Sequence, residues 1–259
     1  MKPRPSFPAR LDTQARPAGA ARRPLPAAPP PRDGGTSIRQ PAFESTRKRM
    51  VAKLVAQGLA DRQVCAALEL VERHRFVDPA LEGQAYEDTS LPIGLGQTIS
   101  KPGVVARMIE LLLNGRTDRL GRVLEVGTGC GYQAAVLSLV ATEVYSIERL
   151  RGLHDKARDN LRAFRLPNVH LLFGDGMAGF AKGAPYAGII AAAGGDAIPT
   201  AWTDQLAVGG RLVAPVAVSG AASGAVGSQS IVVIDKTAQG LRQNVCETVH
   251  FVPLKSGVA

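Results

Sequence analysis

Residues 122–148 read RVLEVGTGCGYQAAVLSLVATEVYSIE, and this stretch decides the fold that the sequence predicts. A short apolar run at 123–126 is followed by a glycine cluster, an apolar segment compatible with a helix, and a second apolar run that ends at Glu148. This order is typical of a strand, a tight glycine turn, a helix and a second strand with an acidic residue at its tip. Glycines allow a sharp turn and close approach of a ligand, and the acid can accept hydrogen bonds from ribose hydroxyls. The stretch therefore predicts a site for an adenosine-type cofactor.

Two classes of cofactor fit the glycine cluster. Residues 129–134, GCGYQA, match the dinucleotide pattern G-x-G-x-x-A, which is weak evidence by itself. An S-adenosylmethionine site tends instead to carry an acid in the strand before glycines at alternate positions, as do Glu125, Gly127, Gly129 and Gly131. The pattern favours S-adenosylmethionine. A dinucleotide site, or a turn that only packs a helix on a strand, stays open at this point.

Composition limits the class of protein. The chain has 259 residues, of which 45% are hydrophobic, enough for one sizeable domain or two smaller ones. Its net charge is +9, but residues 1–40 contain eight basic and two acidic side chains and so carry most of that excess. We therefore expect no specific nucleic-acid partner. No apolar run approaches the roughly 18 residues that span a bilayer, so we expect no membrane insertion.

The three cysteines, Cys65, Cys130 and Cys246, lie far apart and show no metal-binding spacing. They indicate a reducing compartment, and we expect a cytoplasmic protein without a metal site. Cys130 lies in the glycine loop and is a candidate nucleophile. The favoured interpretation is a small residue tolerated in a tight turn, because no histidine is near it in sequence.

The N-terminal part of the chain changes character near residue 42. Residues 1–41 are rich in Pro, Ala and Arg and predict a disordered extension. They lack the apolar core of a secretory signal, and their prolines disfavour the helix of an organelle transit peptide, which remains an alternative. Residues 42–113 predict two helices, the second capped by Asp61, followed by a substrate loop and a third helix. Residues 114–259 predict the cofactor-binding α/β core.

Residues 75–100 form a long segment that proline and glycine interrupt. Its many apolar side chains argue for an ordered loop, and loops of this length are usually functional. Pro102 suits the first turn of a helix over 102–113. Thr98, Ile99 and Ser100 then precede a helix start, where backbone N–H groups favour an anion.

Strands and helices alternate through the rest of the chain. After a helix over 150–164, strands are expected at 169–173, 186–192 and 211–216, with a helix near 200–206. Further strands at 230–234 and 245–252 complete a mixed sheet, and the Gly/Ala/Ser run at 219–228 predicts a flexible loop. Alternation of this kind predicts a doubly wound, Rossmann-like α/β domain.

Two stretches together resemble a known family. AYEDTSLPIGLGQTISKP at 85–102, with VARMIELL at 105–112, is similar to the signature of the protein-L-isoaspartate (D-aspartate) O-methyltransferase family. LEVGTGCGYQAAVLS at 124–138 resembles its cofactor motif, and the similarity continues through QLAVGGRLVAPV at 205–216 and FVPL at 251–254. It covers residues 44–257. It implies a class I methyltransferase fold and a monomer that uses S-adenosylmethionine to methylate the free carboxylate of isoaspartyl residues in damaged proteins.

The resemblance also implies roles for individual residues. Ser100, with Thr98, is the catalytic candidate and would orient the acceptor carboxylate; the alternative for Ser100 is a plain helix N-cap. Glu125 and the glycines would hold the methionine end of the cofactor, Glu148 the ribose, and Asp175 with Gly176 the adenine. An Asp-Gly turn is the alternative for Asp175. The full expected cofactor set is Gln97, Thr98, Ile99, Ser100, Glu125, Gly127, Thr128, Gly129, Gly131, Glu148, Arg149, Asp175 and Gly176.

Several positions depart from the family pattern: Lys101, Gly103, Ala187, the pair Gly194-Gly195, and His250. His250 precedes FVPL where the family usually has Arg, and Arg is a natural partner for a carboxylate. The cofactor half of the pattern is intact, whereas the substrate half is less so. A relative that methylates another carboxylate, or a cofactor-binding protein with little catalysis, therefore remains an alternative.

Overall fold

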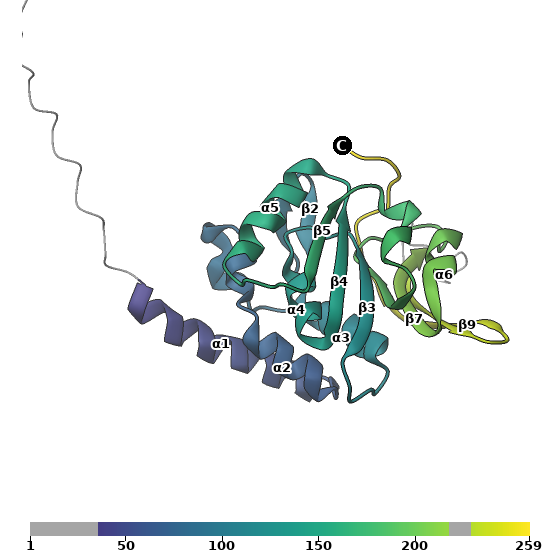
Figure 1. The fold of residues 1–259 in the computed structure, drawn as a ribbon. Helices are drawn as coiled ribbons and strands as arrows, with labels where there is room; N and C mark the ends of the chain where they lie inside the picture. Colours follow the sequence, from purple (N-terminus) through teal and green to yellow (C-terminus); the bar gives the residue numbers. More distant parts are fainter. Residues whose placement is uncertain (1–35, 218–228) are drawn as a thin grey trace, which may run out of the picture. The chain divides into compact units, whose positions relative to one another are not determined.

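The computed structural model describes residues 36–217 and 229–259, and a seven-stranded sheet organises them (Figure 1). The strand order is β5-β4-β3-β6-β7-β8-β9. The first five of these strands run parallel, and β8 and β9 join antiparallel. Their bounds are β3 (Leu120–Val126), β4 (Ala141–Glu148), β5 (Val169–Phe173), β6 (Tyr186–Ala191), β7 (Leu206–Ala217), β8 (Gln229–Thr237) and β9 (Gly240–Val249). The predicted doubly wound α/β fold with a mixed sheet is confirmed.

The central strands bury side chains on both faces. Val123 on β3 and Ile190 on β6 belong to one core cluster, whereas their neighbours Leu124 and Ile189 belong to a second. Successive side chains of a strand point to opposite faces, so this alternation places a core on each side of the sheet. Strands buried on both faces read as continuous apolar runs, which is why these strands were visible in the sequence.

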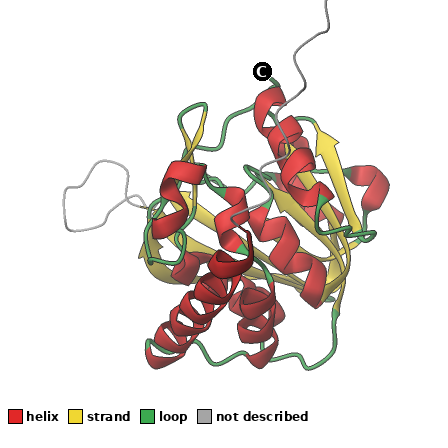
Figure 2. Cartoon of the chain, turned by 90° about the vertical axis from the view of Figure 1, so that its left-hand side faces the viewer, coloured by secondary structure: helices red, strands yellow, loops and turns green. Residues whose placement is uncertain are grey.

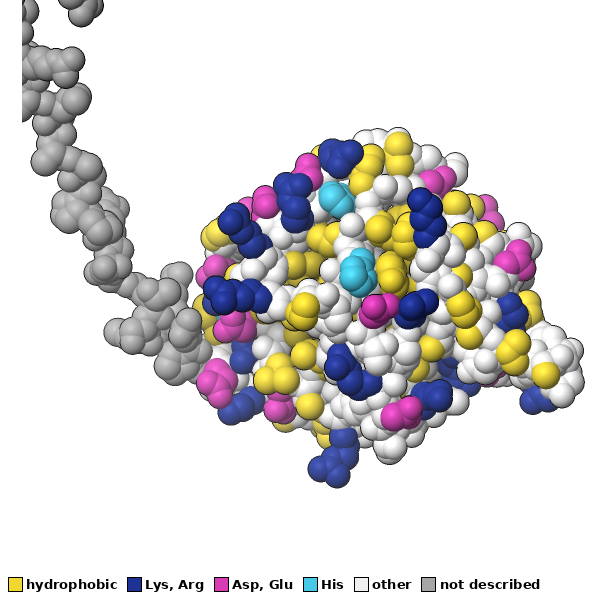
Figure 3. All heavy atoms as spheres, viewed as in Figure 1, with side chains coloured by type: hydrophobic (Ala, Val, Ile, Leu, Met, Phe, Trp, Pro, Cys, Tyr) yellow, Lys and Arg dark blue, Asp and Glu magenta, His cyan; other side chains and the backbone are white. Residues whose placement is uncertain are grey.

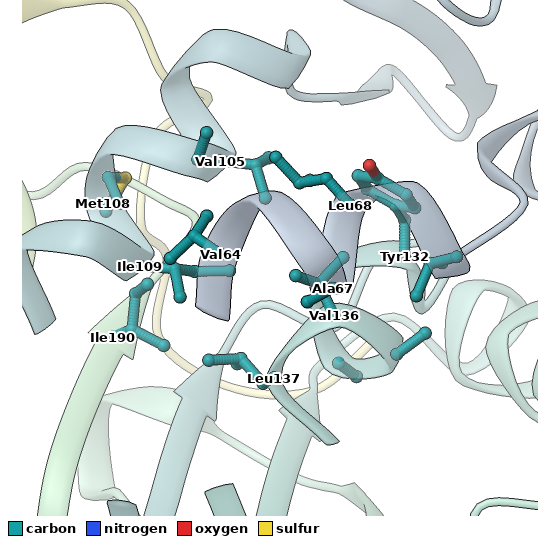
Figure 4. Packing of buried hydrophobic residues seen from close by; sticks show 14 of the residues in the cluster. Val64, Ala67, Leu68, Val105, Met108, Ile109, Tyr132, Val136, Leu137 and Ile190 are labelled. Atoms are coloured by element: carbon teal, nitrogen blue, oxygen red, sulfur yellow. The ribbon is translucent and has the colours of Figure 1, made fainter. Parts of the chain in front are cut away.

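Helices cover one face of the sheet more heavily than the other (Figure 2). The larger cluster includes side chains of α1 to α5, and Figure 4 shows α2 packed between α3 and α4 above Ile190. The second cluster contains Trp202 of α6. The helices are α1 (Thr36–Ala56), α2 (Arg62–Leu70), α3 (Pro102–Leu113), α4 (Tyr132–Val140), α5 (Arg151–Arg162) and α6 (Thr200–Gln205). In the part of the chain that the structure describes, none of these helices is both long and apolar enough to cross a membrane.

The N-terminal boundary differs from the expected one. Helix α1 begins at Thr36, so residues 36–41 are helical rather than part of an unstructured extension. The rest of that extension, and the expected loop at 219–228, lie outside the described residues. Asp61 caps α2 as predicted: its Oδ1 accepts hydrogen bonds from Gln63 N at 2.9 Å and Val64 N at 3.0 Å.

The long segment before α3 is ordered, as predicted, but it holds more structure than its sequence indicated. It contains two short 3₁₀ helices, η1 (Arg73–Phe76) and η2 (Pro79–Gln84), and an antiparallel hairpin of β1 (Leu91–Gly94) and β2 (Gln97–Ile99). The turn residues Gly94, Leu95 and Gly96 all have positive φ. The sequence missed the hairpin because its strands are too short to show a clear alternation. Two further 3₁₀ turns, η3 (Gly176–Ala178) and η4 (Ala181–Gly183), follow β5.

Basic side chains do not gather on the face shown in Figure 3. They lie among acidic, apolar and uncharged groups over the described part of that face. Among the described residues, several basic side chains pair with carboxylates, as Arg107 does with Glu110 and Glu247. The positive net charge of the chain is therefore not concentrated as a basic patch on this face.

Candidate functional site

A cleft opens at the carboxyl ends of β3 and β6. Strand β3 lies between β4 and β6, so the sheet order reverses at this point, and ligands of open α/β sheets bind at such a reversal. The cavity measures about 270 Å³. Its walls are the glycine turn after β3, the β1–β2 hairpin, the end of β4 and the C-terminal residues 252–255. The structure thus brings segments from four distant parts of the sequence around one cavity.

Most of the expected site residues line this cleft. They are Gln97, Thr98, Ile99, Ser100, Gly127, Thr128, Gly129, Glu148, Arg149 and Gly176. Three expected residues do not line it: Glu125, Gly131 and Asp175. Each of the three has a different structural position, described below.

Glu148 stands at the tip of β4, as predicted, with its carboxylate held in place. It is 5% exposed, and its two oxygens accept hydrogen bonds from Gly129 N and Leu150 N, both at 2.9 Å. Each carboxylate oxygen has two lone pairs, so both retain acceptor capacity. A buried carboxylate fixed in this way suits a ligand that donates two neighbouring hydroxyl groups.

The glycine turn divides into a lining part and a packing part. Gly127 and Gly129 line the cleft, and both have positive φ. Gly131 also has positive φ, but a Cβ there would lie 3.0 Å from Leu161 Cδ1 of α5. Gly131 therefore lets α5 pack against the turn, and its expected role as a cofactor contact stays a prediction.

Glu125 lies behind the wall of the cleft instead of in it. It is fully buried, and it accepts a hydrogen bond from Ser146 Oγ, which also bonds to Thr128 Oγ1 at 2.6 Å. Burial raises the pKa of Glu125 to about 8, so its carboxyl group is protonated at neutral pH. Through Ser146, Glu125 supports Thr128, the turn residue that lines the cleft, and its expected contact with the cofactor stays a prediction.

Asp175 is also committed to the backbone. Its Oδ1 accepts from Met177 N at 2.8 Å, and its Oδ2 accepts from Gly257 N at 2.6 Å. Asp175 therefore forms a turn after β5, which was the alternative interpretation. It also holds the C-terminal segment through Gly257. Gly176 beside it does line the cleft.

The corner before α3 presents two hydroxyl groups to the cleft. Thr98 and Ser100 line the cavity, and neither hydroxyl has a hydrogen-bond partner among the described residues. Lys101, not Ser100, occupies the N-cap position of α3, which excludes the capping alternative. The carboxylate of Asp88 accepts from Gly103 N at 2.7 Å and satisfies one donor of the helix start. The hydrogen-bond donors that this corner offers to an anion are therefore the two hydroxyl groups more than the backbone N–H groups of the helix start.

Sequence reasoning missed one donor in the glycine stretch. Gln133, in the first turn of α4, lines the cleft and is 7% exposed. Its side chain helps to lower the pKa of Glu125, yet its Nε2 makes no hydrogen bond of ordinary geometry to a described residue. An unsatisfied buried donor at the wall of a cleft indicates a place for a ligand acceptor. Its position within G-x-G-x-x-A was the available signal.

The C-terminal segment was the larger omission. Val252, Pro253, Leu254 and Lys255 line the cleft, although the similarity of FVPL to the family had suggested no role for them. This segment is held beside β6 by hydrogen bonds from Gly194 N to Val252 O at 2.9 Å and from Leu254 N to Gly194 O at 2.7 Å. The remaining lining residues that were not predicted are Ile93, Leu95, Val105, Val126, Cys130, Tyr132, Ile147, Leu150, Leu153, Ala192 and Ala193.

The departures from the family pattern have different structural settings. A Cβ at Gly194 would overlap the side-chain amide of Gln229, so the glycine is matched to its neighbour. Ala187 lies at the start of β6, at the opposite end of that strand from the cleft. His250 is exposed and does not line the cleft. His250 is therefore not placed to pair with a ligand in the cleft.

Comparisons with known proteins agree with this geometry. A model of the family "Protein-L-isoaspartate(D-aspartate) O-methyltransferase" matches residues 45–259. A protein-L-isoaspartate O-methyltransferase of Methylibium petroleiphilum is 53% identical over 269 aligned positions, which cover 99% of this chain and 98% of that protein. One of Leptothrix cholodnii is 57% identical over 215 positions, covering 82% and 74%.

Solved structures show the same fold. A protein-L-isoaspartate O-methyltransferase superimposes with a TM-score of 0.70 at 27% identity, covering 82% of this chain and 67% of the other. A Plasmodium falciparum protein described as a putative enzyme of this kind, in complex with S-adenosyl-L-homocysteine, gives a TM-score of 0.69 at 22% identity, covering 81% and 98%. At that identity the second likeness supports the fold alone.

Proposed function

The chain belongs to the protein-L-isoaspartate (D-aspartate) O-methyltransferase family, and from this premise we propose how its residues share the reaction. The enzyme transfers a methyl group from S-adenosylmethionine to the free carboxylate of an isoaspartyl residue in a damaged protein, which begins repair. One observation carries the proposed division of roles. The free hydroxyls of Thr98 and Ser100 line the same cleft as the fixed carboxylate of Glu148.

The residues present fit the cofactor. The carboxylate of Glu148 would accept hydrogen bonds from the ribose hydroxyls, and Gly127 and Gly129 would let the backbone approach the ligand closely. The amide of Gln133 would supply a donor for the amino-acid end. When bound, S-adenosylmethionine supplies a methyl group already activated by its sulfonium centre.

The protein's own contribution is positioning. A carboxylate acceptor is ionised at neutral pH, so no general base is needed. Thr98 and Ser100 donate hydrogen bonds that orient the acceptor, and the surrounding walls exclude water; fixed orientation supplies much of the rate gain in such reactions. Cys130 takes no part as a nucleophile, because burial raises the pKa of its thiol and disfavours the thiolate.

Methylation of matched peptides tests the substrate. The enzyme should incorporate methyl groups into an isoaspartyl peptide and not into the same peptide with ordinary aspartate. Equal methylation of both peptides would indicate a relative that acts on another carboxylate. Cofactor binding without turnover on either peptide would indicate a binding protein with little catalysis.

A pair of serine variants tests the proposed corner. Ser100→Ala should lower kcat/KM for the isoaspartyl peptide by about 10- to 100-fold, the usual value of one hydrogen bond to a charged group. Cofactor affinity by calorimetry should stay unchanged. Ser90→Ala removes an exposed serine of the same segment and should leave both quantities at the wild-type level. Parallel losses of rate and cofactor affinity in Ser100→Ala would contradict the assignment.

We further propose that the enzyme works as a monomer in the cytoplasm. The three cysteines are free thiols, which suits a reducing compartment. Light scattering after size exclusion measures the first point, and cell fractionation measures the second. A dimer at micromolar concentration, or recovery outside the cytoplasm, would contradict the proposal.

A further inference from the structure

The cleft is lined by a lysine that has no hydrogen-bond or ion-pair partner among residues 36–217 and 229–259. Its charged lining residues are Glu148, Arg149 and Lys255. Arg149 donates from Nε to the carbonyl of Gly257 at 2.8 Å. The ammonium group of Lys255 makes no hydrogen bond or ion pair within the described residues. Lys255 is therefore the charged lining residue that is not held by any hydrogen bond among the described residues, whereas Arg149 is tied to Gly257 through its Nε.

The backbone around Lys255 is pinned on both sides. On one side, Leu254 N bonds to Gly194 O, just beyond the end of β6. On the other, Gly257 N bonds to Asp175 just beyond the end of β5. In the sheet, β4 and β3 lie between β5 and β6, so residues 252–257 pass across the carboxyl ends of the strands that carry the glycine turn and Glu148. We call this segment the strap. Its hydrogen bonds fix the backbone position of Lys255, while the long side chain of Lys255 stays flexible.

The substrate brings an anion that needs a cation. A carboxylate that leaves water for a cleft is stabilised by a charged hydrogen-bond donor. Thr98 and Ser100 are neutral donors, and His250 is exposed and outside the cleft. We propose that Lys255 pairs with the free carboxylate of the isoaspartyl residue while these two hydroxyls orient it. The proposal rests on the proposed function of the cleft.

The chemistry predicts which step depends on Lys255. The carboxylate oxygen forms a bond to the methyl carbon as the bond from sulfur to that carbon breaks, so the acceptor becomes a neutral ester. The ion pair with Lys255 exists in the bound substrate and weakens as the charge on the acceptor disappears. An interaction stronger in the ground state than in the transition state favours binding over turnover. Lys255 therefore governs peptide affinity and, because the ester has no charge, does not retain the product.

Lys255→Met tests the pairing with little risk to folding, because Lys255 is exposed. The dissociation constant of an isoaspartyl peptide, measured by calorimetry with S-adenosylhomocysteine present, should rise about tenfold, as should its KM. Because the ion pair is weaker in the transition state, kcat should not fall and should rise modestly. Lys255→Arg should retain most of the wild-type affinity. Lys101→Met, which removes an exposed lysine beside Ser100 that does not line the cleft, should have no effect.

Several outcomes separate this proposal from its alternatives. A peptide dissociation constant unchanged in Lys255→Met would overturn it. A loss of S-adenosylmethionine affinity in that variant would also overturn it, because the cation would then serve the carboxylate of the cofactor. Failure of the wild-type enzyme to methylate isoaspartyl peptide would instead contradict the proposed function, and peptide binding would still report on Lys255. Raising the salt concentration should weaken peptide binding more in the wild type than in Lys255→Met.

Discussion

Glu125→Gln distinguishes a buried supporting acid from a cofactor ligand. Glu125 is fully buried beside Ser146, and burial raises its pKa from 4.5 to about 8. In the unfolded chain the same group ionises near its ordinary value. Between these two pKa values the folded state keeps a proton that the unfolded state has released. The contribution of Glu125 to stability is therefore fully present below about pH 4.5 and is lost as pH rises towards 8.

The size of this effect follows from linkage. Each pH unit inside the window costs the folded state up to about 1.4 kcal/mol. From pH 5 to pH 7 the loss from this one group reaches about 3 kcal/mol. Gln has nearly the same shape and does not ionise, and its carbonyl can still accept from Ser146. The free energy of unfolding of Glu125→Gln should therefore depend less steeply on pH. As pH rises, the stability of the variant should increase relative to that of the wild type.

Urea unfolding of both proteins at pH 5, 6, 7 and 8 measures the difference directly. Comparing the two proteins cancels groups that titrate in both, such as His74, whose pKa burial lowers and whose contribution to stability rises with pH. Parallel curves for the two proteins would refute the argument. Calorimetry provides the second arm: cofactor affinity should stay within a few-fold of the wild type. A tenfold or greater loss of that affinity would restore Glu125 as a direct ligand.

Three further changes follow from the structure. Glu148→Gln should weaken S-adenosylmethionine binding by about 10- to 100-fold in calorimetry, because a charged acceptor is lost, whereas Glu143→Gln on the same strand, exposed and outside the cleft, should not. Gly194→Ala should lower the free energy of unfolding by about 1 kcal/mol, because its Cβ would displace the flexible amide of Gln229, which accepts a hydrogen bond from Phe251 N. In a double-mutant cycle, Gly194→Ala introduced into the Gln229→Ala variant should lower the free energy of unfolding much less than it does in the wild type. Asp61→Ala should cost about 1 kcal/mol in urea unfolding, because α2 loses its cap.

The sequence predicted what depends on local pattern. The buried strands β3 and β4 are apolar runs of a length that only a strand fits, and Glu148 marks the end of the second. Asp61 and Pro102 mark helix starts by rules that act within one turn, and both helices begin where those rules place them. Because the glycine turn follows from these elements, the cleft beside that turn was predictable as well.

What the sequence did not predict depends on partners far along the chain. Asp175 bonds to Gly257, 82 residues away, and no local pattern indicates that its carboxylate is already engaged. Glu125 and Glu148 end up on opposite sides of one wall, although both are acids beside the glycine stretch. Their different roles come from the direction in which each side chain points from its strand. That direction becomes clear only once the sheet is assembled.

Two carboxylates at and beside this cleft, those of Glu148 and Asp175, accept hydrogen bonds from the backbone. Glu148 fixes the glycine turn through Gly129, and Asp175 fixes the strap through Gly257. A methyl transfer to a carboxylate needs no acid–base residue, so the fold can use its carboxylates to set backbone geometry. Among the described lining residues, the donors without a hydrogen bond of ordinary geometry include the hydroxyls of Thr98 and Ser100, the amide of Gln133 and the ammonium group of Lys255. These are hydrogen-bond donors suited to anionic ligands, and the ionised carboxylate of the isoaspartyl substrate is an anion of this kind.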